Sequence, residues 1–331
     1  MQKIINEPKA FVDEMLEGLL AAHPEHLRSP AHRVLVSAGA PRQGKVAIVT
    51  GGGSGHLPLF LGYVGYGLAD GVAVGDVFSS PSAEQVAQAT EAVDGGAGVL
   101  YLYGNYSGDV MNFDMASELC SVGGRQVVTF LAADDVASAP RGHEGRRRGI
   151  AGLAFLYKVA GARAEEGACL DEVLSSVQKA GSGLRSIGVA LSPCTVPAAG
   201  RPTFELPAGE MEIGMGIHGE PGVRRGPLGT AGDIARDLVG HIVDDLPYEA
   251  GDEVAVLVNG LGATPREELY VLFSTVHKEL SSRGIGVRRT WVGEYATSLE
   301  MAGASVSLLR LDGEILRLLD APCESPFLVR R

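Results

Sequence analysis

The sequence predicts an α/β protein of two domains, each with a central sheet flanked by helices. A length of 331 residues suggests about two domains. Short apolar runs alternate with amphipathic helical patterns, which indicates βαβ units around a mainly parallel sheet. The 46 glycines follow no collagen-like period and favour many tight turns. We place the domain boundary at the polar, glycine-rich stretch 179–183, which gives domains of residues 1–183 and 184–331.

The elements of the first domain follow from apolar periodicity. Asn6 and Pro8 mark the start of an amphipathic helix that runs to Leu20. Apolar runs predict buried strands at 34–36, 46–49, 99–103 and 127–131. Helical patterns cover 82–93, 111–119 and 150–164, the first of them capped by Ser80 and opened by Pro81.

A second set of elements fills the rest of the chain. Strands are expected at 187–191, 254–258, 287–292 and 306–311, and helices at 234–246 and 265–280. The run Arg146-Arg147-Arg148 is interpreted as a solvated helix start rather than an anion site. No internal repeat, low-complexity tract or heptad pattern is present.

Charge and cysteine usage exclude several classes of function. A formal net charge of -12 disfavours nucleic acid and anionic membranes, because both would be repelled. The four cysteines are scattered without CxxC spacing, so we expect neither a zinc site nor a disulfide framework, and we favour a reducing compartment. The N-terminus lacks a signal-peptide apolar region, and no apolar run approaches the roughly 20 residues that span a bilayer. A cytoplasmic protein is therefore expected.

The most informative stretch is Gly216-Ile217-His218-Gly219-Glu220-Pro221-Gly222-Val223. Glycines close to His218 on both sides allow backbone and ligand to approach the imidazole closely. A neutral imidazole nitrogen in such a loop suits a nucleophile aimed at a small electrophile, provided that another group holds its tautomer. The same stretch is also compatible with a tight turn that carries an exposed histidine and a proline stop.

Two further loops follow predicted strands. Gly51-Gly52-Gly53-Ser54-Gly55-His56 could present backbone N–H groups to an anion or a carbonyl oxygen, or could be an ordinary strand-to-helix turn. It matches neither the Walker A pattern nor GxGxxG. Gly104-Asn105-Tyr106-Ser107-Gly108-Asp109 places a carboxylate where open α/β sheets bind ligands. Asp109 could accept a hydroxyl proton together with His56, or could cap the following helix.

The remaining polar clusters carry no predicted chemistry. Asp134-Asp135, which also follows a strand, is interpreted as turn chemistry. The histidines outside these loops share no ligand spacing, so no metal site is predicted. They are His23, His26, His32, His143, His241 and His277.

Taken together, the chain resembles the substrate-binding K subunit of the dihydroxyacetone kinases. The three loops carry the resemblance, and further matching stretches occur in the family's order over essentially the whole chain. Those stretches are Ser192-Pro193-Cys194-Thr195-Val196-Pro197, Asn259-Gly260-Leu261-Gly262-Ala263-Thr264-Pro265 and Thr297-Ser298-Leu299-Glu300-Met301-Ala302-Gly303.

The resemblance implies two α/β domains, a homodimer and a defined division of labour. The residue matching His218 holds the ketose covalently as a hemiaminal, and those matching His56 and Asp109 are acid/base partners for the hydroxyl that receives phosphate. Gly53, Ser54 and Gly55 would line the substrate pocket. No nucleotide site is recognisable in this chain, so Mg-ATP or Mg-ADP is expected on a separate L subunit. The donor is either ATP itself or a phosphotransferase-system relay.

Two positions depart from the family pattern. Leu57 stands where the family usually has Glu, and Gly104 where it often has Lys. Losing both charges frees volume, which indicates a changed substrate such as the four-carbon ketose erythrulose; compensated drift with dihydroxyacetone retained is the alternative. A non-catalytic ketose sensor that reports to a regulator is the competing function. Joint retention of His56, Asp109 and His218 favours the enzyme, because binding alone needs no proton acceptor.

Overall fold

The computed structural model describes residues 2–331, and the chain divides into two compact units. The first unit contains the chain up to Ala132, together with Ala154–Lys179 and Ile315–Arg331, and the second contains Ala133–Leu153 and Ala180–Glu314. The expected boundary at residue 183 lies close to one crossing between the units. Residues 133–153 and 315–331, however, belong to the opposite unit from the one predicted. Hydrogen bonds explain the exchange, since the Ser186 N–H donates to the Asp134 carbonyl and the Glu324 N–H donates to the Tyr66 carbonyl.

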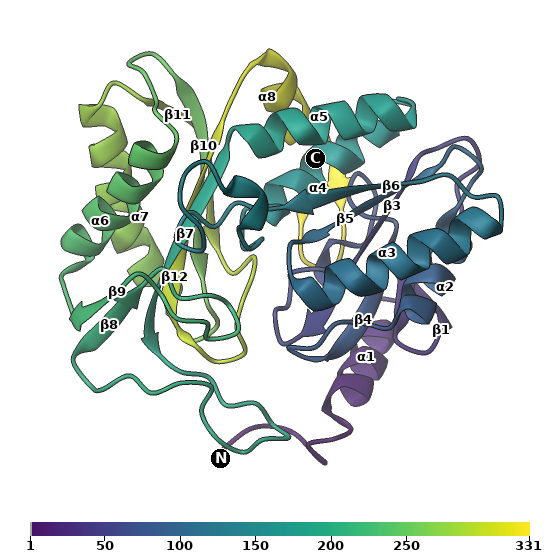
Figure 1. Cartoon of the computed structure of the whole chain (residues 1–331), viewed down its shortest axis with the longest axis horizontal. Helices are drawn as coiled ribbons and strands as arrows, with labels where there is room; N and C mark the ends of the chain where they lie inside the picture. Colours follow the sequence, from purple (N-terminus) through teal and green to yellow (C-terminus); the bar gives the residue numbers. More distant parts are fainter. Residues whose placement is uncertain (1) are drawn as a thin grey trace. The chain divides into compact units, whose positions relative to one another are not determined.

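The first unit contains a six-stranded sheet with the order β1-β2-β4-β3-β5-β6 (Figure 1). Strands β4, β3, β5 and β6 run parallel, while β1 and β2 form an antiparallel edge. The bounds are β1 Leu27–Ala31, β2 Val34–Ser37, β3 Ala47–Ser54, β4 Gly71–Val77, β5 Val99–Gly104 and β6 Val127–Ala132. The predicted parallel arrangement is therefore confirmed for this sheet, although β1 and β4 were not foreseen.

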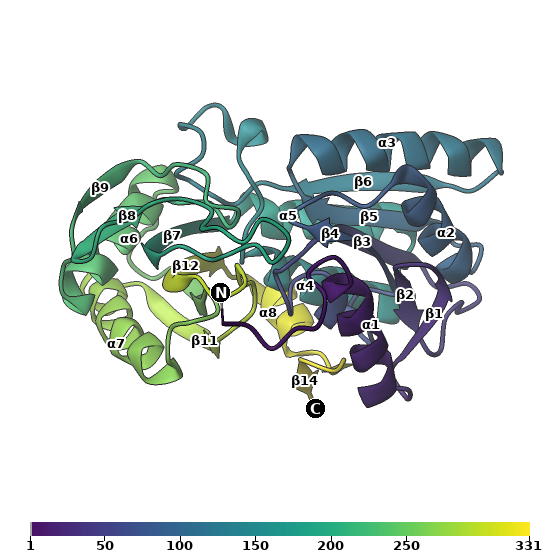
Figure 2. The same ribbon diagram turned by 90° about the horizontal axis from the view of Figure 1, so that it is seen from below.

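Helices cover both faces of this sheet (Figures 1 and 2). Helices α2 and α3 pack with Val49 and Tyr101 in one core, whereas α4 meets the other face, where the Tyr157 hydroxyl bonds to Thr50. The helices of this unit are α1 Phe11–Ala22, α2 Ala83–Val93, α3 Ser107–Val122, α4 Leu153–Glu165, α5 Leu170–Ser182 and α8 Gly313–Asp320. A short 3₁₀ turn lies at Leu61–Tyr63, and a final hairpin consists of β13 Cys323–Glu324 and β14 Val329–Arg330; a second 3₁₀ turn at Glu144–Arg146 belongs to the second unit. The N-cap of α2 is Ser82 rather than Ser80, because Ser82 and Gln85 form a reciprocal capping box.

The second unit has a six-stranded sheet with the order β11-β10-β12-β7-β8-β9. Only β10 and β11 are parallel, joined through α7 as a βαβ unit; every other pair is antiparallel. The expected mainly parallel sheet is thus wrong here, because β12 follows β11 through a loop without a crossover helix. The bounds are β7 Leu184–Ser192, β8 Glu210–Ile213, β9 Arg224–Pro227, α6 Ala231–Asp245, β10 Glu253–Gly260, α7 Arg266–Ser282, β11 Gly286–Gly293 and β12 Ala302–Arg310.

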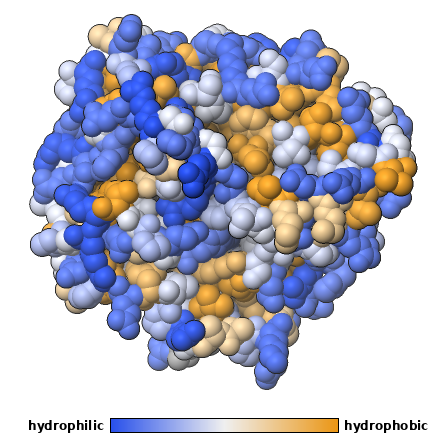
Figure 3. Space-filling view, viewed as in Figure 1, coloured by the Kyte–Doolittle hydropathy of each residue, from blue (hydrophilic) through white to orange (hydrophobic). Residues whose placement is uncertain are grey.

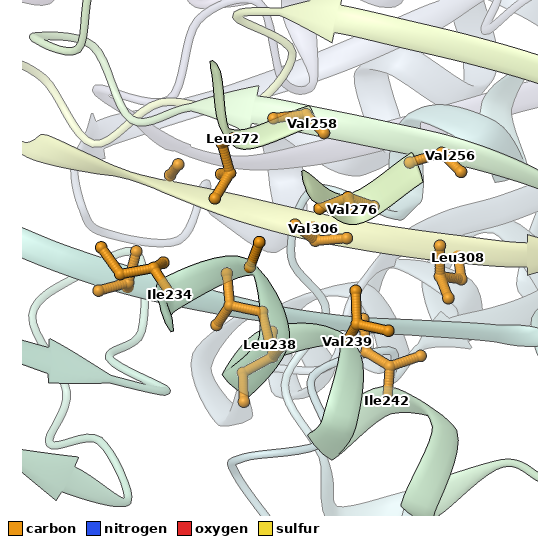
Figure 4. Packing of buried hydrophobic residues seen from close by; sticks show 14 of the residues in the cluster. Ile234, Leu238, Val239, Ile242, Val256, Val258, Leu272, Val276, Val306 and Leu308 are labelled. Atoms are coloured by element: carbon orange, nitrogen blue, oxygen red, sulfur yellow. The ribbon is translucent and has the colours of Figure 1, made fainter. Parts of the chain in front are cut away.

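The core of the second unit forms between this sheet and its two helices. Figure 4 shows Leu238 and Ile242 of α6 and Val276 of α7 packed with Val256 of β10 and Val306 of β12. Both units therefore have the predicted α/β class, with a central sheet flanked by helices. Within residues 2–331, no helix combines the length and the apolar character needed to cross a bilayer.

Candidate active site

The glycine-rich stretch predicted as a loop belongs to β3 as far as Ser54, and it closes around His56, which is 1% exposed. The imidazole stacks on Phe78, with ring centroids 4.9 Å apart, and meets Phe60 edge to face. A Cβ at Gly52 would overlap the Phe60 ring, and one at Gly53 would lie 2.6 Å from the Ser79 nitrogen. The glycines are therefore needed for close packing around His56, beyond their role in a turn.

The two residues between Gly53 and His56 shape the end of β3. The Ser54 hydroxyl donates to the Gly75 carbonyl at 2.8 Å, so its proton is used to join β3 to β4. Gly55 has φ 98°, a left-handed conformation that glycine adopts at no steric cost. The chain consequently turns sharply at Gly55 and directs His56 back into the protein.

Asp109 is the third residue of α3 and is 8% exposed. The N-cap is Tyr106, whose side chain makes no capping bond, so Asp109 is not the N-cap residue of this helix. Strands β3 and β5 are parallel neighbours, paired at Val49 and Tyr101, so the loops that follow them lie at the same edge of the sheet. His56 and Asp109 are therefore both presented at the carboxyl edge of this sheet.

Buried tyrosines lie near Asp109. Burial, followed by the charges of Asp114 and Asp109, raises the pKa of the Tyr103 hydroxyl. Burial also raises the pKa of Tyr157, offset in part by the Thr50 hydrogen bond, and the Asp109 charge adds to the increase. Both phenols therefore stay protonated at neutral pH.

His218 lies in the second unit, in the loop that joins β8 to β9. The loop is closed by hydrogen bonds from the Val223 N–H to the Ile213 carbonyl and from the Gly216 N–H to the Glu220 carbonyl. Gly219 has φ 86°, so the residue after His218 must be able to adopt a left-handed conformation. The predicted glycine-flanked turn is present, and its side chain at His218 stays 24% exposed.

The imidazole of His218 is oriented by a carboxylate. Nδ1 lies 3.0 Å from Oε1 of Glu220, and the His218 backbone N–H donates to Oε2 of the same residue at 3.0 Å. A carboxylate can only accept, so Nδ1 carries the proton and Nε2 carries the lone pair. Burial alone would raise the pKa of Glu220, but the hydrogen bond and charge of His218, with the charge of Arg148, lower it to about 2. Glu220 therefore remains ionised.

The sequence predicted that another group must hold the tautomer of His218, but it did not identify that group. Glu220 could have been found, since it lies two residues after His218 in the same motif. In the segment 133–153, Asp135 does form a turn, because its Oδ1 accepts from the Ala137 N–H at 3.0 Å, although the residue is only 1% exposed and also pairs with Arg148. The interpretation of Arg147 as solvated is wrong, since Arg147 is fully buried and pairs with Asp245 at 2.5 Å.

One group of metal-ligating side chains lies together within residues 2–331. His23, Glu25 and His26 have ligand atoms within 4.8 Å of one another in the loop after α1. The group contains none of the predicted site residues, and its Glu25 is exposed. Spacing along the chain did not single it out.

The Dak1 domain matches residues 17–327 of the chain. The chain is 43% identical over 329 residues to the dihydroxyacetone-binding subunit of PTS-dependent dihydroxyacetone kinase 2 from Listeria innocua, covering 99% of each protein. It is also 45% identical to the D-erythrulose kinase of Mycolicibacterium smegmatis. That alignment includes 98% of this chain but only 56% of the longer kinase.

A solved structure extends the likeness to the whole fold. The co-activator of a dihydroxyacetone kinase operon matches with a TM-score of 0.91 and 31% identity, over 98% of this chain and all of the co-activator. The family resemblance carried by the three loops is thereby confirmed over nearly the full length. The chain belongs to the dihydroxyacetone kinase family and carries its Dak1 domain.

Proposed function

We propose that this chain is the substrate-binding subunit of a short-chain ketose kinase and holds the ketose covalently on His218. The observation that carries the proposal is the His218–Glu220 pair, with Nδ1 held at 3.0 Å by a carboxylate and Nε2 left as the nucleophile. The family membership supports the same reading, because the curated relatives include both dihydroxyacetone-binding subunits and erythrulose kinases.

Covalent capture is a simple addition. The lone pair of Nε2 forms a bond to the carbonyl carbon while the carbonyl π bond breaks onto oxygen. The oxygen takes up one proton, and Nδ1 gives up one proton to solvent past the Glu220 carboxylate, so the product is a neutral hemiaminal and no atom leaves. Fixing a small ketose in this way provides the near-attack geometry that weak non-covalent binding would not.

His56 and Asp109 are proposed as the acid/base partners for the hydroxyl that receives phosphate. Both side chains are buried, and both are presented at the carboxyl edge of the first sheet. A carboxylate or imidazole at that edge can take the hydroxyl proton as phosphate is transferred. Gly53, Ser54 and Gly55 line the pocket in this proposal, since they form the end of β3 and the turn that positions His56.

Phosphoryl transfer needs a metal ion and positive charge near the moving phosphate. We propose that Mg-ATP or Mg-ADP is held by a separate L subunit, recharged in the second case by a phosphotransferase-system relay. The 56% coverage of the longer D-erythrulose kinase supports a second functional part outside the matched region. We also propose a cytoplasmic location, which the four free cysteines within residues 2–331 support.

The test is phosphorylation of a panel of three- to five-carbon ketoses by the chain with a matching L subunit and ATP. We expect turnover that requires both subunits. The co-activator likeness makes a ketose sensor the second candidate. Ketose binding without phosphorylation by any L subunit tested, including a relay-recharged one, would favour that sensor.

The substrate is proposed to be a four-carbon ketose. Sequence identity does not distinguish the two substrates, because the chain is 43% identical to the dihydroxyacetone-binding subunit and 45% identical to the D-erythrulose kinase. Gly104 is buried at the end of β5, where it pairs with Ala132, and Leu57 directly follows His56. Both positions adjoin proposed site residues, so the lack of a charged side chain at each supports a roomier and less polar pocket.

Gly104→Lys is expected to penalise the four-carbon ketose more than dihydroxyacetone. The lysine stem would fill the freed space, and its ammonium would need solvation or a partner. We expect a shift in the kcat/KM ratio of roughly 1–3 kcal/mol, the range for one carbon in a pocket. Gly18→Lys on the exposed face of α1 is the matched control, since nothing lies within 4 Å of its new Cβ. A wild type that prefers dihydroxyacetone, with Gly104→Lys acting equally on both sugars, would contradict the proposal.

We further propose a homodimer through the first unit. Strand β6 is the edge strand of its sheet, and its apolar side chains other than Ala132 are only partly buried. Helix α3 beside it exposes one apolar stripe at helical spacing, and Figure 3 shows apolar atoms gathered over this region. The stripe consists of Met111, Met115, Leu119 and Val122, exposed by 62, 49, 54 and 92%. An apolar edge strand suits antiparallel pairing with the same strand of a second copy about a two-fold axis.

Replacing Met115 and Leu119 together with glutamate is expected to convert the dimer to a monomer. Two new charges on each stripe would be buried against each other across the two-fold axis. Light scattering coupled to size exclusion measures the mass directly. Val271→Glu on α7, at a site 58% exposed, controls for added surface charge. A wild type that is monomeric at micromolar concentration, or a double variant that stays dimeric, would rule out this interface.

A further inference from the structure

The segment that joins β6 to α4 places an ion pair behind the His218 loop. Asp135 is 1% exposed, and Oδ2 accepts from Arg148 Nε at 2.9 Å and lies 2.7 Å from Nη2. The Nη2 group also donates to the Gly214 carbonyl at 3.1 Å, and the Arg148 backbone N–H donates to the Ser138 hydroxyl. The guanidinium is thus fixed between its own segment and the start of the β8–β9 loop.

The Nη1 group of this guanidinium faces Glu220, the partner of His218. Nη1 of Arg148 lies 3.7 Å from Oε2 of Glu220, whose Oε1 accepts from Nδ1 of His218. Gly216 makes the approach possible, because a Cβ there would overlap both Oε2 of Glu220 and Nη1 of Arg148. Asp135, Arg148, Glu220 and His218 therefore form one continuous chain of contacts within the second unit.

The charges of these four linked side chains favour a positively charged imidazole at His218. With His218 neutral, one guanidinium and two carboxylates sum to minus one. When Nε2 bonds to a carbonyl carbon, the ring becomes an imidazolium until Nδ1 loses its proton, and the sum becomes zero. Arg148 alone would oppose that cation, and Asp135 cancels its charge. Because Asp135 offsets the charge of Arg148, the guanidinium can fix the position of Glu220 without weakening the attraction between the Glu220 carboxylate and the imidazolium.

We propose that Asp135 and Arg148 are positioning residues that act through Glu220 to hold Nδ1 of His218 protonated and to stabilise the imidazolium formed during ketose capture. The proposal rests on the proposed function of His218. It differs from a purely structural role, in which the ion pair would only join the 133–153 segment to the β8–β9 loop.

The test compares Arg148→Lys and Asp135→Asn with Arg147→Lys. Arg147 is the neighbouring residue, is fully buried and also pairs with an aspartate, Asp245. A lysine cannot contact Asp135 and Glu220 with a rigid fork as arginine does. We expect the two network variants to slow adduct formation roughly 10-fold or more. Arg147→Lys should match their loss in Tm but capture the ketose within about twofold of wild type.

Histidine ¹⁵N NMR at pH 7.5 supplies a readout that a structural role would not move. In wild type we expect the His218 signals of an Nδ1–H tautomer, and in both network variants a mixture of tautomers. Wild-type capture rates with an unchanged tautomer in Arg148→Lys and Asp135→Asn would overturn the proposal, whatever their Tm. If wild type forms no adduct, the proposed function of His218 fails, while the tautomer comparison still decides whether the network orients the ring.

Discussion

His218→Ala is expected to abolish the covalent ketose adduct and to lower phosphorylation roughly a thousandfold or more, the scale for losing a nucleophile. The imidazole provides the only atom proposed to bond to the substrate, and alanine leaves the Glu220 carboxylate facing an empty space. Intact-protein mass after reductive or denaturing trapping measures the adduct. Wild type should gain one substrate mass per chain, and the variant none.

His241→Ala is the matched control for the loss of a histidine from the second unit. His241 lies on α6, its side chain is 43% exposed, and it contacts Asp237 rather than the β8–β9 loop. The control should keep both adduct and turnover. An adduct that persists unchanged in His218→Ala would assign the covalent bond to another residue.

Much of the fold follows from local pattern because most strands are apolar runs bounded by turns. Strands β5 and β10 were predicted within two residues, since each is buried along nearly its whole length. Strand β3 was predicted to end at residue 49, because the glycines that follow resemble a loop, but it continues to Ser54. Strand β4 was missed because Gly75 and Asp76 interrupt its apolar run. The exchange of 133–153 and 315–331 between units depends on hydrogen bonds between residues far apart in the chain, such as Ser186 to Asp134, which no local pattern encodes.

The candidate site likewise contains features that local sequence predicts and others that depend on contacts between distant residues. Glycines around His56 and His218 were visible in the sequence because close approach and positive φ demand that residue. The roles of Arg148 and Asp135 were not visible, since a run of three arginines usually faces solvent. Only the folded chain shows that Arg147 and Arg148 point to different aspartates, the partly buried Asp245 and the buried Asp135. Ion pairs between distant residues thus determine the burial of these arginines, which the local sequence predicted to be solvated.

The position of Asp109 is compatible with two roles, stabilising helix α3 and accepting a proton. As the third residue of α3, its carboxylate lies near the positive end of the helix dipole, which stabilises the helix by about 0.3–1 kcal/mol. As a buried carboxylate at the carboxyl edge of the first sheet, it is also placed to accept a proton. Substitution by asparagine keeps the shape and removes both effects, but their magnitudes differ greatly. The helix effect costs less than tenfold in any equilibrium, and loss of a general base costs far more.

Asp109→Asn is therefore expected to leave ketose binding largely intact and to slow phosphoryl transfer roughly a hundredfold or more. The adduct measured by mass reports binding, and single-turnover kinetics with saturating L subunit and ATP report transfer. Asp114→Asn on the exposed face of the same helix controls for removal of a nearby carboxylate, and it should change neither quantity more than about twofold. If binding and transfer fall together in Asp109→Asn, with a lower Tm, the residue stabilises α3 and the general base must be sought at His56 alone.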